Sequence, residues 1–224
     1  MKILTIADEE SKSLWDYYDP ERLRGVELIL SAGDLSPAYL EFLVTLTNCP
    51  LLYVRGNRDS RYEKEPPGGC ICIEDRIYNY KGLRILGLGG CMRYNSGSNQ
   101  YTESEMRRRV RKSEISAVLM NGFDILLAHA PARGYGDMDD LPHMGFECFN
   151  PLLEKWKPRY FVHGHVHKSY GHFNPIITHS AGTTIVNCFD HQIIDFPESE
   201  FPSRGQTGSP LYDLYMALMR RGDA

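Results

Sequence analysis

The chain has 224 residues, with 25 lysine and arginine residues against 29 aspartate and glutamate residues, and its formal net charge is −4 at pH 7. Hydrophobic residues make up 42% of the sequence and charged residues 24%, which excludes a disordered, collagen-like or coiled-coil chain. Such a mildly acidic chain gives no general reason to expect nucleic acid or an anionic membrane as a partner. At this length we expect one large domain that buries about 70% of the unfolded surface.

The cysteines and the beginning of the chain bear on its cellular compartment. Six cysteines occur without a Cys-x-x-Cys pair, so the sequence indicates neither a disulfide scaffold nor a zinc knuckle. The apolar start Met1–Ala7 is followed at once by acidic residues and is too short for a signal peptide. No apolar run approaches the roughly 20 residues of a membrane span. We therefore expect a soluble, cytoplasmic protein with no membrane partner.

Ten short runs rich in apolar and β-branched residues, each followed by polar residues or glycine, are typical of strands. The runs are Lys2–Ala7, Val26–Ala32, Leu51–Arg55, Cys70–Tyr80, Leu83–Leu88, Asp124–Ala128, Tyr160–Val162, Ile176–Thr178, Thr184–Phe189 and Gln192–Phe196. The alternation of strand and helix at the beginning predicts parallel pairing. The turn Tyr80-Lys81-Gly82 and the strand-rich end predict antiparallel hairpins. We therefore expect an α/β protein with mixed sheets.

Three segments between the strands have helical patterns. The expected helices are Ala38–Leu46, Thr102–Met120 and Phe146–Trp156. Pro37 fits the first position of the first helix, with Ser36 as its N-cap, whereas Pro151 should disturb the early part of the third. The residues expected to face inward from the second and third helices are Met106, Val110, Ile115, Leu152, Leu153 and Trp156.

A basic cluster within the second helix is flanked by acidic residues. The cluster consists of Arg107, Arg108, Arg109, Arg111 and Lys112, and the acids are Glu103, Glu105 and Glu114. Because opposite charges at helical spacing pair on a helix surface, we expect an exposed, salt-bridged face rather than a nuclease surface.

The end of the chain changes in composition. Residues 197–208 are rich in proline, serine, glycine and glutamate and are typical of a linker after a domain at residues 1–196. Ser209-Pro210 then begins an amphipathic helix over residues 209–224. We expect this helix to pack on its own domain, with a homodimer contact as the alternative.

Polar side chains with metal-binding chemistry follow five of the predicted strands. In chain order the motifs are Asp8-Glu9-Glu10, Gly33-Asp34, Gly56-Asn57-Arg58-Asp59, Ala128-His129 and His163-Gly164-His165-Val166-His167. Ligands of open α/β sheets bind outside the carboxyl ends of the strands, and these residue types bind metals there. Alternate residues of an extended segment point the same way. Asp8 and Glu10 can therefore converge on one point, and so can His165 and His167. One motif alone is typical of a turn, whereas all five in this order are specific.

In this order the motifs resemble those of the calcineurin-like metallophosphoesterases. That family has Asp-x-His, Gly-Asp, Gly-Asn-His-Asp/Glu, an isolated His and Gly-His-x-His, and Gly182-Thr183-Thr184 with Val186-Asn187 resembles its closing strand. The resemblance covers about residues 1–196. It implies two mixed sheets packed as a sandwich and flanked by helices, an α/β/β/α architecture with two divalent metal ions at one edge.

Carried over by position, the resemblance implies two sets of metal ligands that share Asp34. The first metal would be bound by Asp8, Glu10, Asp34 and His167, and the second by Asp34, Asn57, His129 and His165. Two such cations clamp a phosphate and lower the pKa of a shared water, which would attack phosphorus as hydroxide. Asp34, Asn57 and Arg58 are the expected catalytic residues.

Two residues depart from the family pattern. Glu10 replaces a histidine, and a carboxylate is a harder ligand that favours Mn²⁺, Mg²⁺ or Fe²⁺ over Zn²⁺, so we expect manganese. Arg58 replaces the histidine that assists the leaving group. Arginine is not a practical proton donor near neutral pH but stabilises negative charge on phosphate. The enzyme would then need good leaving groups, water or another acid; a surface role for Arg58 is the alternative.

Loops after the predicted strands are suited to line the cleft. One is Gly89–Tyr94 and the other begins at Pro131. Arg93, together with Arg58, is the expected substrate-binding residue, although a solvated Arg93 is the alternative. His163 is expected to be a hydrogen-bonded strand histidine rather than a ligand.

The leading hypothesis is a dinuclear-metal phosphoesterase acting on small-molecule phosphate esters. Phosphodiesters such as nucleotides come first, with monoesters and phosphoproteins as alternatives. A different reading is a non-catalytic or weakly catalytic metal-binding interaction module, like a retromer subunit of the same fold. The clustered carboxylates favour the enzyme, because they repel each other without a metal.

Overall fold

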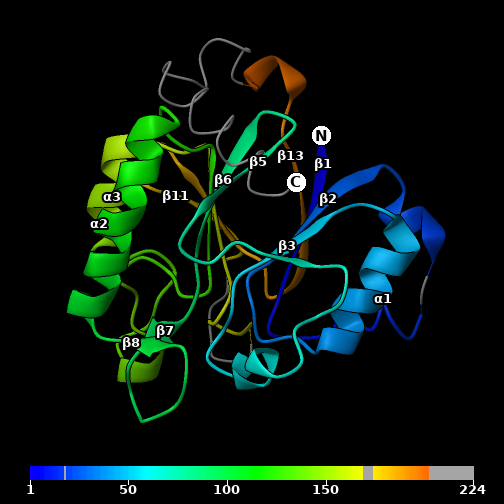
Figure 1. Cartoon of the computed structure of the whole chain (residues 1–224), viewed down its shortest axis with the longest axis horizontal. Coiled ribbons are helices and arrows are strands. Elements are labelled where there is room, and N and C mark those ends of the chain that lie inside the picture. The colour runs from blue at the N-terminus through cyan, green and yellow to red at the C-terminus, as the bar shows by residue number, and fades with distance from the viewer. Residues whose placement is uncertain (18, 169–173, 202–224) are drawn as a thin grey trace, which may run out of the picture.

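A computed structural model describes residues 1–17, 19–168 and 174–201. Two sheets pack face to face, with α1 outside one of them and α2 and α3 outside the other (Figure 1). The helices are α1 Pro37–Thr47, α2 Glu103–Leu119 and α3 Phe149–Trp156, and short 3₁₀ helices cover Pro20–Leu23, Asp59–Glu63, Leu141–His143 and Glu198–Glu200. The predicted α/β/β/α architecture is confirmed.

The first sheet has five strands in the order β13-β1-β2-β3-β4. Their bounds are β1 Lys2–Ala7, β2 Val26–Ser31, β3 Leu51–Tyr53, β4 Ile71–Cys72 and β13 Asp190–Asp195. β1, β2, β3 and β4 run parallel, and β13 pairs with β1 antiparallel. The strand–helix–strand start therefore forms the parallel pairs that its sequence predicted.

The second sheet has six strands in the order β11-β12-β10-β9-β6-β5, and β7 and β8 form a separate pair. Their bounds are β5 Ile77–Tyr80, β6 Leu83–Leu88, β7 Cys91–Met92, β8 Gln100–Tyr101, β9 Ile125–Ala128, β10 Tyr160–His163, β11 Ile176–Thr178 and β12 Thr184–Asn187. The β5–β6 hairpin turns through Lys81 and Gly82, both with positive φ, as a tight hairpin turn requires. This antiparallel hairpin and that of β11 with β12 confirm the mixed sheets.

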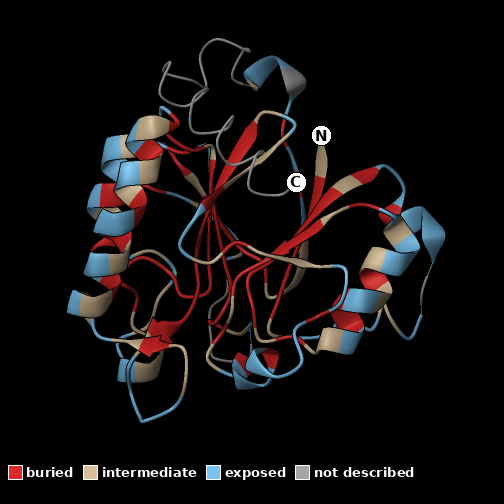
Figure 2. Ribbon diagram, in the orientation of Figure 1, coloured by how far each residue is buried: buried red, intermediate tan, exposed pale blue. Residues whose placement is uncertain are grey.

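Three layers of buried apolar residues lie between these elements (Figure 2). The middle layer joins the inner faces of the two sheets, with Leu30 and Leu52 on one side and Leu127 and Val162 on the other. The outer layers pack α1 on the first sheet and α2 and α3 on the second. Because both faces of the central strands are covered, these strands are mostly apolar, with few exceptions such as Thr5 in β1 and Arg84 in β6, and polar groups gather at the strand ends.

The helices begin and end at recognisable caps. The Ser36 hydroxyl accepts a hydrogen bond from the Tyr39 N–H, which confirms Ser36 as the N-cap of α1. Thr102 caps α2 through a reciprocal capping box with Glu105. α3 begins at Phe149, three residues later than predicted, which places Pro151 in the first turn, where the missing N–H has no cost.

Two expectations for α2 were wrong. Ile115 does not face inward: it is 65% exposed, because the buried stripe of α2 runs through Met106, Val110, Ser113 and Ala117. Arg109 is not part of an exposed face. Its side chain is 12% exposed and pairs with Glu74 and Asp75, whereas Arg107 makes the expected pair with Glu103.

The run Cys70–Tyr80 is not one strand. It divides into β4 in the first sheet and β5 in the second, so the chain crosses between the sheets there. Asp75 turns the backbone with a φ of 56°, and the Glu74 carboxylate accepts the Arg55 N–H at 2.7 Å. Strand periodicity cannot reveal this break, because it depends on tertiary partners.

The end of the described chain packs on the domain. Phe201 lies against Phe196, and Arg159 pairs with Glu200 at 3.3 Å. The predicted helix at residues 209–224 and most of the predicted linker lie outside the described residues. Among the described residues, no helix has the length and the apolar character needed to cross a membrane.

Candidate metal centre

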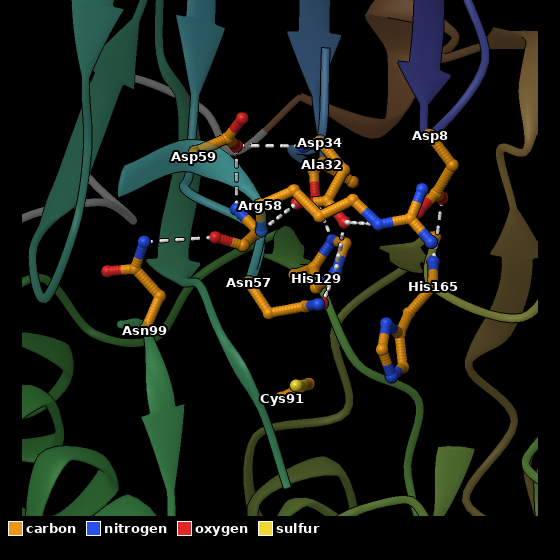
Figure 3. Close-up of polar contacts among 12 residues, drawn as sticks. Asp8, Ala32, Asp34, Asn57, Arg58, Asp59, Cys91, Asn99, His129 and His165 are labelled. Carbon is orange, nitrogen blue, oxygen red and sulfur yellow. Dashed lines mark hydrogen bonds and ion pairs between the residues drawn. The ribbon is translucent and has the colours of Figure 1, made fainter. Parts of the chain in front are cut away.

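The strand ends of both sheets meet at one edge of the molecule, where their loops carry polar side chains (Figure 3). Asp8 follows β1, and Asp34 and Asn57 lie in the loops after β2 and β3. His129 follows β9, and His165 lies two residues beyond β10. Because β1, β2 and β3 run parallel in the first sheet, and β9 and β10 in the second, their carboxyl ends bring together residues far apart in sequence.

Three of these residues have an unusual backbone conformation. Asp8, Asp34 and His165 adopt left-handed φ angles of 65°, 62° and 68°. Residues other than glycine rarely adopt this conformation, and it is concentrated at functional sites. In each loop the sharp turn directly after the strand directs the side chain toward the centre.

Glycines let the loops approach these side chains. A Cβ atom at Gly56 would lie 2.0 Å from Oδ1 of Asp34, and one at Gly164 would lie 2.3 Å from Oδ2 of Asp8. Both distances are far inside van der Waals contact, so only glycine fits at either position.

The converging side chains include a group suited to bind a cation. One ligand atom each from Asp8, His129 and His165 lie within 4.8 Å of one another. Nε2 of His129 also lies 3.6 Å from Oδ2 of Asp34, and Nε2 of His167 lies 3.4 Å from Oδ1 of Asp8. Five of the predicted ligands are therefore brought together by these contacts.

Asp8 and Asn57 give further evidence on what the centre can hold. Oδ1 of Asp8 is buried and accepts no well-aligned hydrogen bond among the described residues; Nε2 of His167 faces it at 3.4 Å. A buried carboxylate oxygen that is poorly hydrogen-bonded is costly, and a cation would remove that cost. Oδ1 of Asn57 lies 3.0 Å from Nε2 of His129 and adds a neutral oxygen to the set. Carboxylate, amide and imidazole donors together fit a divalent first-row metal.

Main-chain carbonyl groups orient the two buried imidazoles. Nδ1 of His129 donates to the Ala32 carbonyl at 2.7 Å, which leaves Nε2 directed at the acids. Nε2 of His165 lies 2.7 Å from the Pro142 carbonyl. Partners of this kind fix the tautomer of metal-binding histidines.

The charges in the centre are strongly coupled. Burial alone would raise the pKa of Asp8, but the imidazoles of His167 and His129 outweigh it and lower that pKa. Burial likewise opposes protonation of His129, and the nearby carboxylates of Asp34 and Asp8 outweigh it and raise its pKa. Burial, aided by His129, lowers the pKa of His165 to about 3, so that ring is neutral and has a lone pair to donate.

Asp59 holds two of the loops together, a role that sequence reasoning did not assign. Its Oδ2 accepts the backbone N–H groups of Asp34 at 2.7 Å and Gly56 at 2.8 Å. Burial, together with the Asp34 charge, raises the pKa of this carboxyl to about 7. The sequence did contain one indication of this role: Asp59 is an acid at the end of the motif Gly56-Asn57-Arg58-Asp59, directly after the predicted catalytic residues Asn57 and Arg58.

Glu10 lies apart from the group of three ligands. Its Oε1 accepts a hydrogen bond from the Ser36 N–H at 3.2 Å, at the beginning of α1. Its role as a ligand stays a prediction.

The two arginines predicted to bind substrate have different surroundings. Arg58 has a 63% exposed side chain that extends over the carboxylates in Figure 3, with Nε 3.8 Å from Oδ2 of Asp34. Arg93 is engaged by Glu105 at 2.9 Å and by the Gln100 carbonyl. Beside it, the Tyr94 hydroxyl accepts a hydrogen bond from Nδ2 of Asn57 at 3.2 Å.

The neighbouring His163 is a buried strand histidine, as the sequence predicted. Nδ1 of His163 lies 2.9 Å from the Gly164 carbonyl, and burial lowers the pKa of the ring to about 4. It therefore supports the β10 loop as a neutral residue.

Comparison with known families shows which family the chain belongs to. The family model of the calcineurin-like phosphoesterase superfamily domain matches residues 1–188. The chain belongs to the calcineurin-like phosphoesterase superfamily. Two similar proteins of Caenorhabditis elegans are UPF0046 protein T07D4.2, 38% identical over 127 residues, and UPF0046 protein C25E10.12, 27% identical over 132 residues.

The two matches cover 56% and 55% of this chain but only 30% and 43% of the worm proteins. The chain therefore spans less than half of the length of these curated relatives.

Among solved structures, TT1561 of Thermus thermophilus has a TM-score of 0.56 at 14% identity, and the match covers 84% of this chain and 89% of TT1561. The phosphopantetheinyl hydrolase PptH of Mycobacterium tuberculosis has a TM-score of 0.51 at 11% identity, covering 92% and 93%. At such identities these structures support the fold alone.

Membership of the calcineurin-like phosphoesterases confirms the family resemblance drawn from the motifs. The matched residues 1–188 include every predicted ligand, from Asp8 to His167. Glu10 and Arg58, the two expected departures from the family pattern, lie within the matched residues.

Proposed function

We propose that this calcineurin-like domain is a phosphodiesterase that uses two divalent cations, preferentially Mn²⁺. The convergence of Asp8, His129 and His165, with Asp34 and His167 alongside, is the observation that carries the proposal. The buried Oδ1 of Asp8 supports it, because that oxygen accepts no well-aligned hydrogen bond and a cation would satisfy it.

The chain's own residues divide into two overlapping sets around Asp34. Asp8 and His167 would hold one cation with Asp34. The Ser36 N–H occupies only Oε1 of Glu10, so Glu10 would join them through Oε2. The second set is Asp34, Asn57, His129 and His165. Divalent cations in such a centre lower the pKa of a bound water and neutralise charge on the phosphate.

The residues outside these sets would act on the substrate. The exposed guanidinium of Arg58 beside Asp34 is placed to donate hydrogen bonds to phosphate oxygens. Arginine does not supply a proton to the leaving group near neutral pH. Esters with acidic leaving groups, such as aryl phosphodiesters, should therefore react fastest. A rate that is independent of leaving-group pKa, with chemistry rate-limiting, would contradict this role of Arg58.

The decisive experiment compares wild type with Asp34→Asn. Metal stoichiometry and Mn²⁺ affinity would be measured by calorimetry, and hydrolysis would be measured on nitrophenyl mono- and diesters with Mn²⁺, Mg²⁺, Fe²⁺ and Zn²⁺. The variant removes the shared anion, so it should lose activity and bind metal weakly. Asp16→Asn, at an exposed position, serves as the control. Wild-type turnover by Asp34→Asn would refute the assigned centre.

The position of Glu10 favours one alternative, a metal-binding interaction module with little catalysis. Its carboxylate pairs with the Ser36 N–H rather than with the group of three ligands. Both readings predict that Mn²⁺ raises the melting temperature. Only the enzyme predicts turnover, so metal-dependent stabilisation without hydrolysis of any ester would support the module.

A further inference from the structure

The loop of residues 133–145, called the Asp137 loop below, is folded around one carboxylate. Oδ1 of Asp137 accepts the Gly134 N–H at 2.8 Å, and Oδ2 accepts the Gly145 N–H at 3.0 Å. Nη1 of Arg133 donates to the same Oδ2 at 2.7 Å. The Asp137 side chain is only 6% exposed. One buried carboxylate thus joins both ends of the loop.

Further hydrogen bonds connect this carboxylate to the tip of the loop. Arg133 also donates to the Met138 carbonyl at 3.0 Å. The Met138 N–H donates to the His143 carbonyl at 3.1 Å, and the His143 N–H to the Asp140 carbonyl at 3.1 Å. The conformation of the 3₁₀ turn Leu141–His143 therefore depends on Arg133 and Asp137.

That tip is in contact with the candidate metal centre. The Pro142 carbonyl lies 2.7 Å from Nε2 of His165, and the His143 ring packs against the same imidazole with centroids 5.4 Å apart. A carbonyl oxygen only accepts hydrogen bonds, so Nε2 of His165 must carry the proton. Nδ1 is then the only nitrogen of that ring with a lone pair for a cation.

We propose that Asp137 is a positioning residue: it holds the Pro142 carbonyl against His165 and thereby selects the tautomer whose Nδ1 binds the cation. The inference rests on the proposed function, because it concerns a ligand of that centre. It assigns the Asp137 loop a part in metal binding, where the sequence indicated only a wall of the cleft.

The test uses the metal-free full chain and reads the tautomer directly. Long-range ¹H–¹⁵N correlation spectra distinguish Nε2–H from Nδ1–H imidazole, and His165→Gln identifies the signals of His165. Wild type should show the Nε2–H tautomer alone. Asp137→Ala should show a mixture. Asp137→Asn removes the charge paired with Arg133 and one of the two acceptor oxygens but keeps the other, so it should show a smaller shift in the same direction.

A matched control separates positioning from stability. Asp124 is also a buried carboxylate paired with an arginine, Arg84, at 2.7 Å, but it lies away from the centre. Asp124→Asn should lower the melting temperature without changing the His165 tautomer. In calorimetry with Mn²⁺, the Asp137 variants should bind about 10–100-fold more weakly, the usual effect of removing a partner that orients a ligand.

Two results would overturn the inference. One is an Nδ1–H signal for His165 in the wild type, and the other is an unchanged tautomer and Mn²⁺ affinity in both Asp137 variants. If Asp137→Ala does not fold, Asp137→Asn carries the test. Absence of Mn²⁺ binding by the wild type would refute the proposed function instead, and the spectra would still decide whether the loop sets the tautomer.

Discussion

The two sheets contribute different halves of the centre, and they position their side chains in different ways. The first sheet supplies the carboxylates of Asp8 and Asp34, which project from left-handed residues and require glycines opposite them. The second sheet supplies the imidazoles of His129 and His165, which main-chain carbonyls orient. Backbone conformation places the acids, whereas the two histidines also have hydrogen-bond acceptors that orient their rings, and His165 combines both with its own φ of 68°.

This difference follows from the side chains themselves. A carboxylate has two equivalent oxygens, so it needs only a direction, and a sharp turn after a strand supplies one. An imidazole has two unequal nitrogens, so a partner must also select which of them carries the proton. We call Asp8 and Asp34 the carboxylate half of the centre, and His129 and His165 the imidazole half. Changes to the backbone should weaken metal binding mostly through the carboxylate half. Changes to hydrogen-bond partners should weaken it mostly through the imidazole half.

The largest effect is expected for Gly56→Ala, which places a methyl group 2.0 Å from Oδ1 of Asp34. Displacing the shared carboxylate by about 1 Å should cost about 100-fold in kcat/KM. Gly25→Ala is the control: Gly25 has a positive φ, unlike Gly56, but no atom lies within 4 Å of the added carbon, so this variant reports backbone strain without a clash. Equal losses in the two variants, measured by steady-state kinetics, would contradict the steric argument.

Asp59→Ala should have the next largest effect. It removes the acceptor shared by the Asp34 and Gly56 N–H groups, so Mn²⁺ affinity should fall by about 10–100-fold. Asp59→Asn keeps an oxygen acceptor and should restore most of the affinity. Calorimetry on both variants checks this, and an affinity that Asn does not restore would show that the charge matters rather than the hydrogen bonds.

The stability of the protein should depend on pH through His163, which lies next to the loop that carries His165. Burial lowers the pKa of His163 to about 4, against about 6.5 in an unfolded chain. Between these values the unfolded state binds more protons, so the free energy of unfolding should fall as the pH drops from about 6.5 to about 4. Urea unfolding of metal-free His163→Gln should show a smaller fall than wild type. Parallel curves would contradict the contribution of His163.

The smallest effect should come from Tyr94→Phe. It removes the hydroxyl that accepts from Nδ2 of Asn57 and so frees the amide that presents Oδ1 to the centre. One neutral hydrogen bond contributes about 0.5–1.5 kcal/mol, so Mn²⁺ affinity should fall by about two- to tenfold. Tyr17→Phe is the exposed control. An unchanged Mn²⁺ affinity in Tyr94→Phe would contradict a role for the Tyr94 hydroxyl in positioning Asn57.

The sequence predicted what depends on short-range pattern. Apolar runs gave the strands, and the residues directly after them gave Asp8, Asp34, His129 and His165, because a strand end fixes where the next side chain can lie. Together with the family motifs, this was enough for the sandwich of two sheets and for five ligands that the structure brings together.

What the sequence could not show depends on tertiary partners. Ile115 is apolar and was expected to be buried, but the orientation of α2 exposes it. Arg109 is charged and was expected to be exposed, but it is mostly buried by its ion pairs with Glu74 and Asp75. The Pro142 carbonyl has no signature at all, since every residue has a carbonyl group. Its importance appears only where the folded chain places it against His165.

The crossing at Glu74 has a consequence for the width of the centre. Acids from one sheet and imidazoles from the other keep their spacing only if the sheets do not slide past each other. Glu74 lies at this junction: its carboxylate accepts the Arg55 N–H after β3 and the Gly89 N–H after β6, and it pairs with Arg109 of α2. A single acid outside the centre thus fastens the loop after β3 in one sheet to the loop after β6 in the other.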